Sequence, residues 1–376
     1  MLTQATISWS VVVRWSECFP CPVCTARMDK LLRNFWYIAL PSRALKAGKI
    51  VGKQLLGEKL LVGRRGDGSV FALRDICPHR GIPLSYGHLD QDQVCCCYHG
   101  WKFDSASGKC SEIPSLADPE NFKFDRVRVP PYPCQEVQGN IWVFIAYDPL
   151  HPPRDGDLPP VPSVPYFGNV FPQVAEQFLF NCHVDQAVIG LMDPAHGPYV
   201  HNAWWWRAGN HQFRIKEKPY EPTEMGFRLV PYTMPYSARP YKLLGKKVSI
   251  EITFALPTIR VEILHGDRHT VCLLTVISPI DEFRCEVHQS IYWTMPWLTP
   301  FKPILVYLTR QFMDQDLAIV EKQQEGLAFD PALMLIDDAD TQAKWYFRLK
   351  QEYEQAWAED RDFVNPLQPK TLRWRS

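Results

Sequence analysis

The spacing of apolar residues divides the chain into segments of different character. Between about residues 34 and 147, short apolar runs such as Lys59–Gly63, Val70–Leu73 and Asn140–Tyr147 are separated by turn residues. Runs of this length, bounded by Gly, Asp and Pro, predict β-strands. Arg65–Gly68 supplies residues that tolerate the positive φ of a hairpin turn. The pattern predicts a small all-β domain.

The second half of the chain mixes helical and extended patterns. Phe180–His201 indicates mostly helix. Apolar residues at every second position then predict antiparallel strands, and longer apolar stripes predict helices near the end. The strands are predicted at 248–254, 259–263, 271–277 and 287–293, and the helices at 302–325 and 340–357. Strands followed by helices indicate an α+β fold, with the sheet packed against a long helix.

Proline is concentrated between these two parts, with eight prolines from Pro149 to Pro172, which is typical of a linker or an ordered arm. A chain of 376 residues is long enough for two domains. We therefore predict an N-terminal extension at 1–33 that is disordered, an all-β domain at 34–148, a Pro-rich linker at 149–173 and an α+β domain at 174–376.

The N-terminal extension carries three cysteines, Cys18, Cys21 and Cys24, at two-residue gaps. Three thiols without a nearby fourth ligand make an incomplete metal site. We interpret the residues before Met28 as a tail or a start-codon artefact, because Met28 opens a sequence that is typical of an ordinary start.

Charge and cysteine content exclude some classes of protein and favour a metal-binding one. Lys plus Arg and Asp plus Glu both number 41, so no net positive field attracts nucleic acid or anionic lipid. No apolar run approaches the about eighteen residues of a membrane span, and we expect a cytoplasmic protein without a transmembrane segment. The twelve cysteines cluster, as at Cys95–Cys97 and beside histidines, which favours metal ligation in a reducing compartment over a disulfide framework.

The first metal signature is Cys77-Pro-His79 followed, after sixteen residues, by Cys96-x-x-His99. Each half supplies one thiolate and one imidazole. Two cysteines on one iron and two histidines on the other describe a Rieske [2Fe–2S] cluster. Among the three consecutive cysteines Cys95–Cys97, only Cys96 has two residues between itself and His99, so we predict Cys96 as the ligand. A structural zinc site with the same four ligands is the alternative.

The sequence around these ligands resembles the Rieske domains of ring-hydroxylating and demethylating oxygenases. The resemblance covers Cys77–Ser85 and Cys96–Phe103, and it extends to Gly108–Cys110 and to Ile113-Pro114. It favours the cluster over zinc and implies that 34–148 is a Rieske [2Fe–2S] domain.

A second metal signature is Asp193-x-x-His196-x-x-x-x-His201. Two histidines and a carboxylate form a facial triad that leaves iron positions open to O₂ and substrate. The string resembles the mononuclear iron motif of the same oxygenases and lies where they place it, so 174–376 is predicted to be the catalytic domain.

The third ligand of the triad is predicted to be Asp316. Phe312–Gln324 resembles the late helix of the family, in which a glutamate follows the aspartate by five residues, as Glu321 does here. On a helix, Asp316 shares the apolar face of Phe312, Ile319 and Val320, and a carboxylate buried there needs a metal or a partner. Asp314 lies on a wetter face and is the alternative ligand.

The resemblance also implies a role for Asp193. In the family this aspartate bridges the iron ligand, here His196, and the outer cluster histidine, His99 of the partner subunit, which couples the two metals. The chain is then expected to form a homotrimer. Relatives carry an Asn or an acid before this aspartate, where the chain has Ile189 and Gly190. The hydrogen bond that this Asn or acid makes is then missing or comes from Asp185.

These features predict an oxygenase component. The resemblance implies that an external NAD(P)H-dependent reductase or ferredoxin passes electrons through the cluster to mononuclear Fe(II), where O₂ hydroxylates or demethylates a small hydrophobic substrate, aromatic or polycyclic. The motif also looks like relatives acting on tetrapyrroles and sterols. A desaturase with the same metals and a non-catalytic Rieske electron carrier with a ligand-binding domain are the alternatives. Trp204–Trp206 and His288 could line a pocket, but packing is the preferred interpretation for both.

Overall fold

The computed structural model describes residues 31–148, 155–201, 214–233, 244–245, 247–329, 331 and 333–376. They divide into two compact units. The β unit contains Arg33–Ser163 and Ser278–Asp281, and the larger unit contains Val164–Ile277 and Glu282–Ser376. Nearly all of the predicted N-terminal extension with its cysteines, the start of the predicted linker at 149–154, and Trp204–Trp206 lie outside the described residues.

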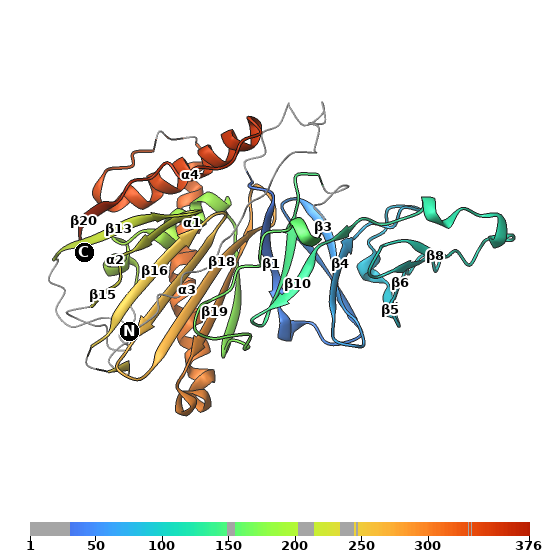
Figure 1. Cartoon of the computed structure of the whole chain (residues 1–376), viewed down its shortest axis with the longest axis horizontal. Helices are drawn as coiled ribbons and strands as arrows, with labels where there is room; N and C mark the ends of the chain where they lie inside the picture. Colours follow the sequence, from blue (N-terminus) through green and yellow to red (C-terminus); the bar gives the residue numbers. More distant parts are fainter. Residues whose placement is uncertain are drawn as a thin grey trace. The chain divides into compact units, whose positions relative to one another are not determined.

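The β unit consists of three small sheets, all antiparallel (Figure 1). The first has the order β1 (Phe35–Pro41), β11 (Asn140–Ile145), β10 (Cys134–Val137). The second has the order β2 (Lys49–Leu55), β3 (Glu58–Arg64), β4 (Val70–Arg74), β9 (Pro131–Tyr132). The third has the order β5 (His88–Asp90), β6 (Gln93–Cys95), β7 (Lys102–Asp104), β8 (Cys110–Glu112). The all-β prediction for this part of the chain is confirmed.

Apolar packing in the β unit surrounds the two predicted cysteine ligands. Cys77 and Cys96 are 1% and 4% exposed, and they belong to one buried cluster with Leu61, Phe71 and Phe103. Side chains in such a core are close-packed and hold fixed positions. The core therefore fixes the start of each predicted ligand loop.

A short segment from late in the sequence completes the β unit. The hydroxyl of Ser278 donates a 2.7 Å hydrogen bond to the carbonyl of Ile38. The backbone N–H groups of Leu56 and Gly57 donate to the carbonyls of Pro279 and Ile280 at 2.9 and 2.8 Å. The alternating pattern at 271–277 predicted a strand here, but it gave no sign that the residues after Ile277 pack in the other unit.

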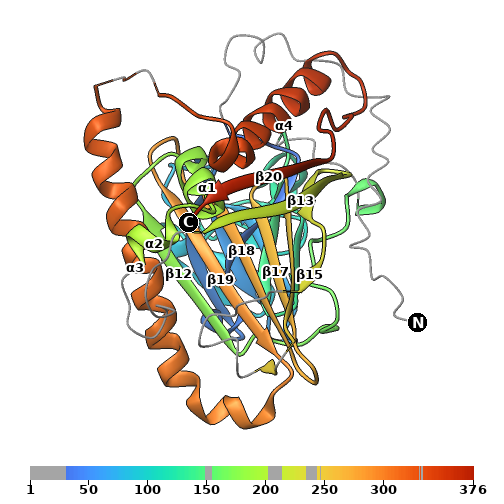
Figure 2. The ribbon, with the colours of Figure 1, turned by 90° about the vertical axis from the view of Figure 1, so that its left-hand side faces the viewer.

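The larger unit is built on a sheet of nine described strands (Figures 1 and 2). Its order is β12-β19-β18-β17-β16-β14-β13-β20, with β15 paired to β16. The bounds are β12 (Val174–Phe180), β13 (Ile215–Thr223), β14 (Gly226–Leu229), β15 (Tyr232–Thr233), β16 (Ser249–Ala255), β17 (Ile259–His265), β18 (Thr270–Pro279), β19 (Cys285–Trp293) and β20 (Lys370–Arg375).

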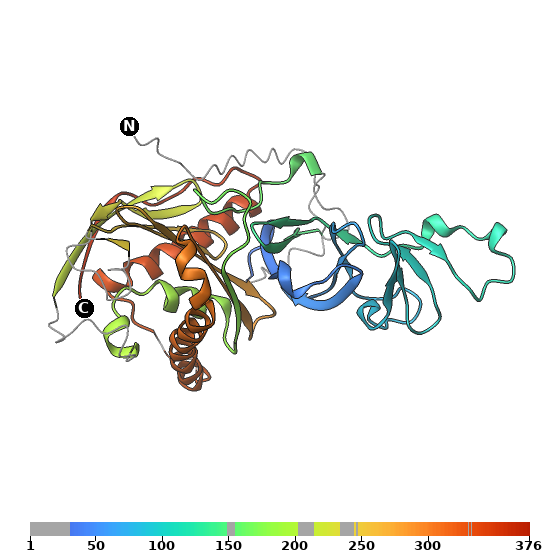
Figure 3. The same ribbon diagram turned by 90° about the horizontal axis from the view of Figure 1, so that it is seen from below.

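Four α-helices are described in the same unit: α1 (Val184–Met192), α2 (Gly197–Val200), α3 (Lys302–Leu327) and α4 (Thr341–Ala358). The long helix α3 packs along β12 and contacts α1 and α2 (Figures 2 and 3). Its buried residues, Met313, Asp316 and Val320, recur at helical spacing and form one stripe. The α+β prediction, with an antiparallel sheet and a long helix, is confirmed. No helix in the described residues is both long and apolar enough to span a membrane.

Three details of the sequence prediction are wrong. Phe180 ends a strand and does not begin a helix, and α1 ends at Met192 because the residue before a proline, here Asp193, takes an extended backbone. The strands β12, β13, β14, β15 and β20 were not predicted, because they are short or carry polar and charged residues at several positions. Ile319 is 46% exposed and does not share the buried face of Asp316.

Candidate metal centres

The two predicted cluster loops have the same backbone hydrogen bonds. In the first, Cys77 N–H donates to the carbonyl of Ile82 at 2.9 Å, and Gly81 N–H donates back to Cys77 at 2.9 Å. The second repeats this pattern from Cys96, at 2.9 and 3.1 Å. Gly81 and Gly100, four residues after each cysteine, have φ of +75° and +70°, which glycine adopts without strain. The repeat makes Cys96 the structural equivalent of Cys77.

The neighbours of Cys96 are placed differently. Cys95 is the last residue of β6, and its thiol lies 3.9 Å from the carbonyl of Gln93. Cys97 is exposed. The loop repeat and the burial of Cys96 favour the ligand that the spacing predicted.

The imidazoles and thiols of the loops fit a metal cluster. The rings of His79 and His99 have centroids 4.5 Å apart, and Trp101 stacks on His79 at 4.6 Å with an interplanar angle of 5°. Nδ1 of His99 is buried and has no hydrogen-bond partner among the described residues, as expected of a nitrogen that binds metal. Burial raises the pKa of the Cys77 thiol to about 11, and a bound metal would offset this by ionising the thiol.

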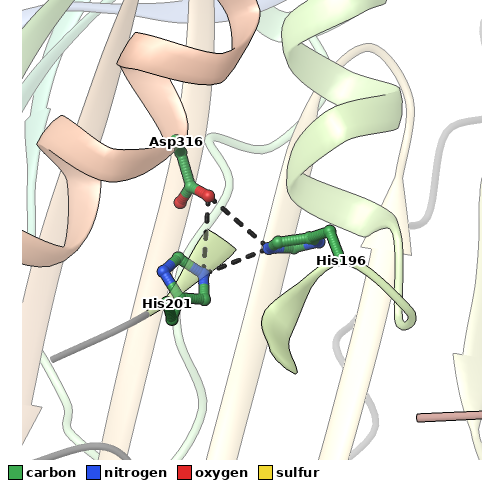
Figure 4. A group of neighbouring side chains, drawn as sticks. All are labelled: His196, His201 and Asp316. Atoms are coloured by element: carbon green, nitrogen blue, oxygen red, sulfur yellow. Dashed lines mark hydrogen bonds and ion pairs between the residues drawn. The ribbon is translucent and has the colours of Figure 1, made fainter. Parts of the chain in front are cut away.

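In the larger unit, His196, His201 and Asp316 converge (Figure 4). Nε2 of His196 lies 3.1 Å from Nε2 of His201. Oδ1 of Asp316 lies 3.5 and 3.4 Å from these two nitrogens. One atom from each residue lies within 4.8 Å of the others, and two imidazoles with one carboxylate are the donor set of non-heme iron. The three predicted triad residues are therefore brought together, although the sequence separates Asp316 widely from the histidines.

The chain between the two helices sets the spacing of the histidines. After α1, the carboxylate of Asp193 accepts a 2.7 Å hydrogen bond from Ala195 N–H, which forms a tight turn. The single-turn helix α2 then separates His196 from His201, and His201 N–H donates to the carbonyl of Gly197 at 3.0 Å. The two imidazoles stand at opposite ends of one helical turn, which lets both reach the same point.

Each imidazole is oriented through its second nitrogen. Nδ1 of His196 lies 2.8 Å from the backbone carbonyl of Asp193, and Nδ1 of His201 lies 3.2 Å from Oε1 of Gln315. A carbonyl oxygen can only accept, so each Nδ1 carries the proton and each Nε2 presents its lone pair to the centre. Phe312 also stacks on His201 at 3.7 Å. The sequence prediction missed Gln315; its position beside Asp316 was the available signal.

The charges in the triad suit a cation. Burial, followed by the nearby His196, lowers the pKa of His201 to about 4. Burial raises the pKa of Asp316 to about 7, and the charge of Arg260 opposes this rise. Without metal, burial therefore favours the neutral forms of His201 and Asp316. A bound cation would stabilise the ionised carboxylate of Asp316. Asp314 is exposed on the opposite side of α3, so the geometry favours Asp316 as the ligand.

The surroundings of His196 differ from the expectation in two respects. The carboxylate of Asp193 lies 3.9 Å from Nδ1 of His196, beyond hydrogen-bond distance, and the backbone carbonyl of Asp193 makes the bond instead. The carboxylate of Asp185 binds Tyr346 and Lys350. It therefore does not supply the hydrogen bond that the Asn or acid before the aspartate makes in the relatives. The side chain of Asp193 is 33% exposed.

Comparison with known proteins identifies the β unit. Residues 35–133 match the Rieske [2Fe-2S] domain. The oxygenase subunit of 3-chlorobenzoate-3,4-dioxygenase from Comamonas testosteroni is 44% identical over 119 residues, which are 31% of this chain and 27% of that protein. Chlorophyllide a oxygenase from Oryza sativa is 28% identical over 79% of this chain and 52% of its own length. The chain therefore contains a Rieske [2Fe-2S] domain and is similar to Rieske oxygenases.

The fold of the Rieske oxygenases extends over most of the chain. The crystal structure of dicamba monooxygenase bound to dicamba aligns with a TM-score of 0.71 and 23% identity, covering 87% of this chain and 98% of that one. The matched part of the chain spans between 26% and 52% of the length of the first curated relatives. The match of residues 35–133 excludes the zinc alternative, because a Rieske domain holds a [2Fe–2S] cluster. The group of His196, His201 and Asp316 fits the mononuclear iron of the similar oxygenases.

Proposed function

We propose that this protein is a terminal oxygenase. Electrons from a separate NAD(P)H-dependent reductase or ferredoxin pass through the cluster to mononuclear iron, and O₂ hydroxylates or demethylates a hydrophobic substrate, aromatic or polycyclic. The observation that carries this proposal is the convergence of His196, His201 and Asp316 in the same chain as a Rieske domain. A pure electron carrier would have no use for a second centre with open coordination positions.

The proposed ligand sets are defined by residue. Cys77, Cys96, His79 and His99 would hold the cluster, and His196, His201 and Asp316 would hold the iron. The bound metals supply one-electron transfer and O₂ chemistry. The protein fixes the tautomers of His196 and His201 through carbonyl oxygens. It also limits water at the triad, since His201 and Asp316 are 3% and 7% exposed and Phe312 covers one imidazole face.

Partner and location follow from the same proposal. The partly exposed carboxylate of Asp193 is available to His99 of the partner subunit, which supports electron transfer between subunits of a homotrimer. The nine described cysteines form no disulfide with one another, which supports a reducing compartment such as the cytoplasm.

Metal analysis tests the proposal. Protein purified without air should contain about three irons and two sulfides per chain. His196→Ala should lose one iron and keep both sulfides. His265→Ala, on the same sheet but outside the triad, is the matched control and should keep all three irons. Two irons and two sulfides in all three proteins would replace the oxygenase proposal with the electron-carrier alternative.

Labelled oxygen separates the oxygenase from the desaturase. Both reactions need the same metals, so metal content does not distinguish them. The product formed under ¹⁸O₂ should carry label if the substrate is hydroxylated. An unlabelled product with a new double bond would show that the chain is a desaturase.

A further inference from the structure

Two thiols lie together where strand β12 ends and helix α1 begins. Phe180, the last residue of β12, is paired with Cys285, the first residue of β19. Cys182 follows two residues later, just before α1 starts at Val184. The side chains of Cys182 and Cys285 form a hydrogen bond with each other. We call these two residues the thiol pair, and neither belongs to the proposed ligand sets of the metals.

The thiol pair is buried, but it lies close to the surface. Cys182 and Cys285 are 1% and 0% exposed. The residues on either side of Cys182 reach solvent, because Asn181 is exposed and the side chain of His183 is 21% exposed. A molecule of the size of water or hydrogen peroxide therefore has a short path to the pair.

The sulfur of Cys182 accepts a backbone hydrogen bond from helix α1. The donor is the N–H of Ala187, whose nitrogen also lies 3.4 Å from the carbonyl oxygen of His183. Helix α1 has nine residues, and the N–H groups in the first turn of a helix carry partial positive charge. A sulfur placed at this end of a helix is stabilised more as a thiolate than as a thiol.

The Cys182 thiol ionises more readily than other buried thiols of the chain. The hydrogen bond from Cys285 lowers the pKa of Cys182, burial opposes this effect, and the N–H of Ala187 adds to the lowering. By contrast, burial raises the pKa of Cys110 and of Cys272. The thiolate is the form of cysteine that reacts with oxidants. Cys182 therefore has the features of a nucleophile, and Cys285 lies in place to react with it.

We propose that Cys182 and Cys285 are an oxidation site, which hydrogen peroxide converts to a disulfide. The Cys182 thiolate attacks one peroxide oxygen, so that an S–O bond forms, the O–O bond breaks and hydroxide leaves. The sulfur of Cys285 then attacks the sulfenic acid on Cys182, so that the S–S bond forms and the S–O bond breaks. The protons of the two thiols convert both departing hydroxides to water. Two thiols thus lose two electrons, and one peroxide is reduced to two water molecules.

The disulfide would join the start of α1 to β19. Its S–S bond of about 2.05 Å is shorter than the contact between two thiols, so the two segments are drawn together. The two cysteines are about a hundred residues apart in the chain, and a cross-link over such a distance strongly restricts the unfolded state. Oxidation should therefore stabilise the larger unit, and this effect does not depend on the proposed function.

Peptide mapping tests the inference. The metal-loaded full chain would be treated with a molar excess of hydrogen peroxide, its remaining thiols blocked with iodoacetamide, and the protein digested with trypsin. Cleavage after Arg and Lys places the two cysteines in separate peptides, 155–207 and 285–310. Mass spectrometry should find these peptides cross-linked, with two hydrogen atoms lost, and should find them separate after reduction. Cys272, a fully buried thiol of β18, should remain reduced.

Variants separate the roles of the two thiols. In Cys285→Ala, oxidation should stop at the sulfenic acid of Cys182, which dimedone traps. In Cys182→Ala, Cys285 should stay reduced, because the nucleophile is missing. Cys272→Ala is the matched control and should form the cross-link as the unchanged chain does. After peroxide treatment, the unchanged chain should melt about 5 °C or more above Cys182→Ala, relative to the difference between the two proteins before treatment.

Three results would overturn the inference. The first is a thiol pair that stays reduced under conditions that oxidise the exposed thiol of Cys97. The second is a cross-link that joins Cys182 or Cys285 to a third cysteine. The third is dimedone labelling of Cys285 in Cys182→Ala, which would show that Cys182 is not the nucleophile. The metal content of untreated protein tests the proposed function separately, so neither result depends on the other.

Discussion

At the scale of single residues, the triad depends on groups that do not touch the metal. The imidazoles of His196 and His201 each have one nitrogen bonded to a carbonyl oxygen, from the backbone of Asp193 and from the side chain of Gln315. A hydrogen bond of this kind fixes the tautomer and the ring orientation of a ligand, and its loss typically costs about 10–100-fold in metal affinity.

The first prediction concerns Gln315. Gln315→Leu should weaken metal binding at the triad by about 10–100-fold, because His201 loses the acceptor that orients it. Gln315→Glu keeps an acceptor and should retain binding. Titration of the metal-depleted triad with Co²⁺ measures the dissociation constant. Equal affinities for Gln315→Leu and the unchanged protein would show that Phe312 stacking alone orients the ring.

The second prediction concerns pH. In the metal-free protein the pKa of Asp316 is about 7 and that of His201 is about 4. Between these values a metal must displace the proton of Asp316 but finds His201 already neutral. Affinity for Co²⁺ should therefore rise with pH, by up to about tenfold per unit, and become constant above pH 7. Titrations from pH 5.5 to 8 measure this, and Asp316→Asn should remove most of the slope.

At the scale of elements, a buried ionic cluster joins α1 to α4. Nζ of Lys350 lies 2.8 and 2.9 Å from the two carboxylate oxygens of Asp185, and the hydroxyl of Tyr346 donates to the same carboxylate at 2.6 Å. The side chains of Lys350 and Asp185 are 9% and 15% exposed. Helix α1 is followed directly by Asp193 and His196. By fixing α1 against α4, this cluster also fixes the start of the segment that carries the triad histidines.

The third prediction follows from this burial. Lys350→Met should lower the free energy of unfolding by about 3–5 kcal/mol, because Asp185 is left as a buried charge without its cation. Lys344→Met on the same helix is the control. Its partner Asp337 is 79% exposed, so the expected loss is about 0–1 kcal/mol. Urea denaturation measures both variants, and similar losses would show that the buried pair has no special role.

At the scale of the whole molecule, the β unit is discontinuous in sequence. Ser278–Asp281 belongs to it although the surrounding chain builds the other unit. The three hydrogen bonds to Ile38, Leu56 and Gly57 come from this segment. A fragment that ends at Ser163 lacks all three.

The fourth prediction is that a fragment of residues 31–163 still holds the cluster but melts earlier than the same unit in the full chain. All four proposed cluster ligands lie within it, so about two irons and two sulfides should remain. The missing bonds are worth about 1 kcal/mol each. Visible circular dichroism of the cluster during heating compares the two proteins. An unchanged melting temperature would mean that Ser278–Asp281 only rests on the β unit.

The sequence by itself determined the two metal signatures and the fold class. The cluster residues lie in two short loops, and the two triad histidines lie five residues apart, so local spacing was sufficient to find them. Helical periodicity separates a buried face from a wet one, so it favoured Asp316 over Asp314, and the structure brings Asp316 beside the two histidines. The same argument misplaced Ile319, since burial depends on what covers a helix.

Only the tertiary structure decided the rest. The bond between Gln315 and His201, the pairing of Lys350 with Asp185, and the return of Ser278–Asp281 to the β unit all join residues far apart in the chain. Strand order and register are set by pairing between distant segments and by which face is buried. The pattern along a strand indicates which of its faces is buried, but not which element packs against that face. For this reason the sequence predicted the metal sites but not the residues that surround them.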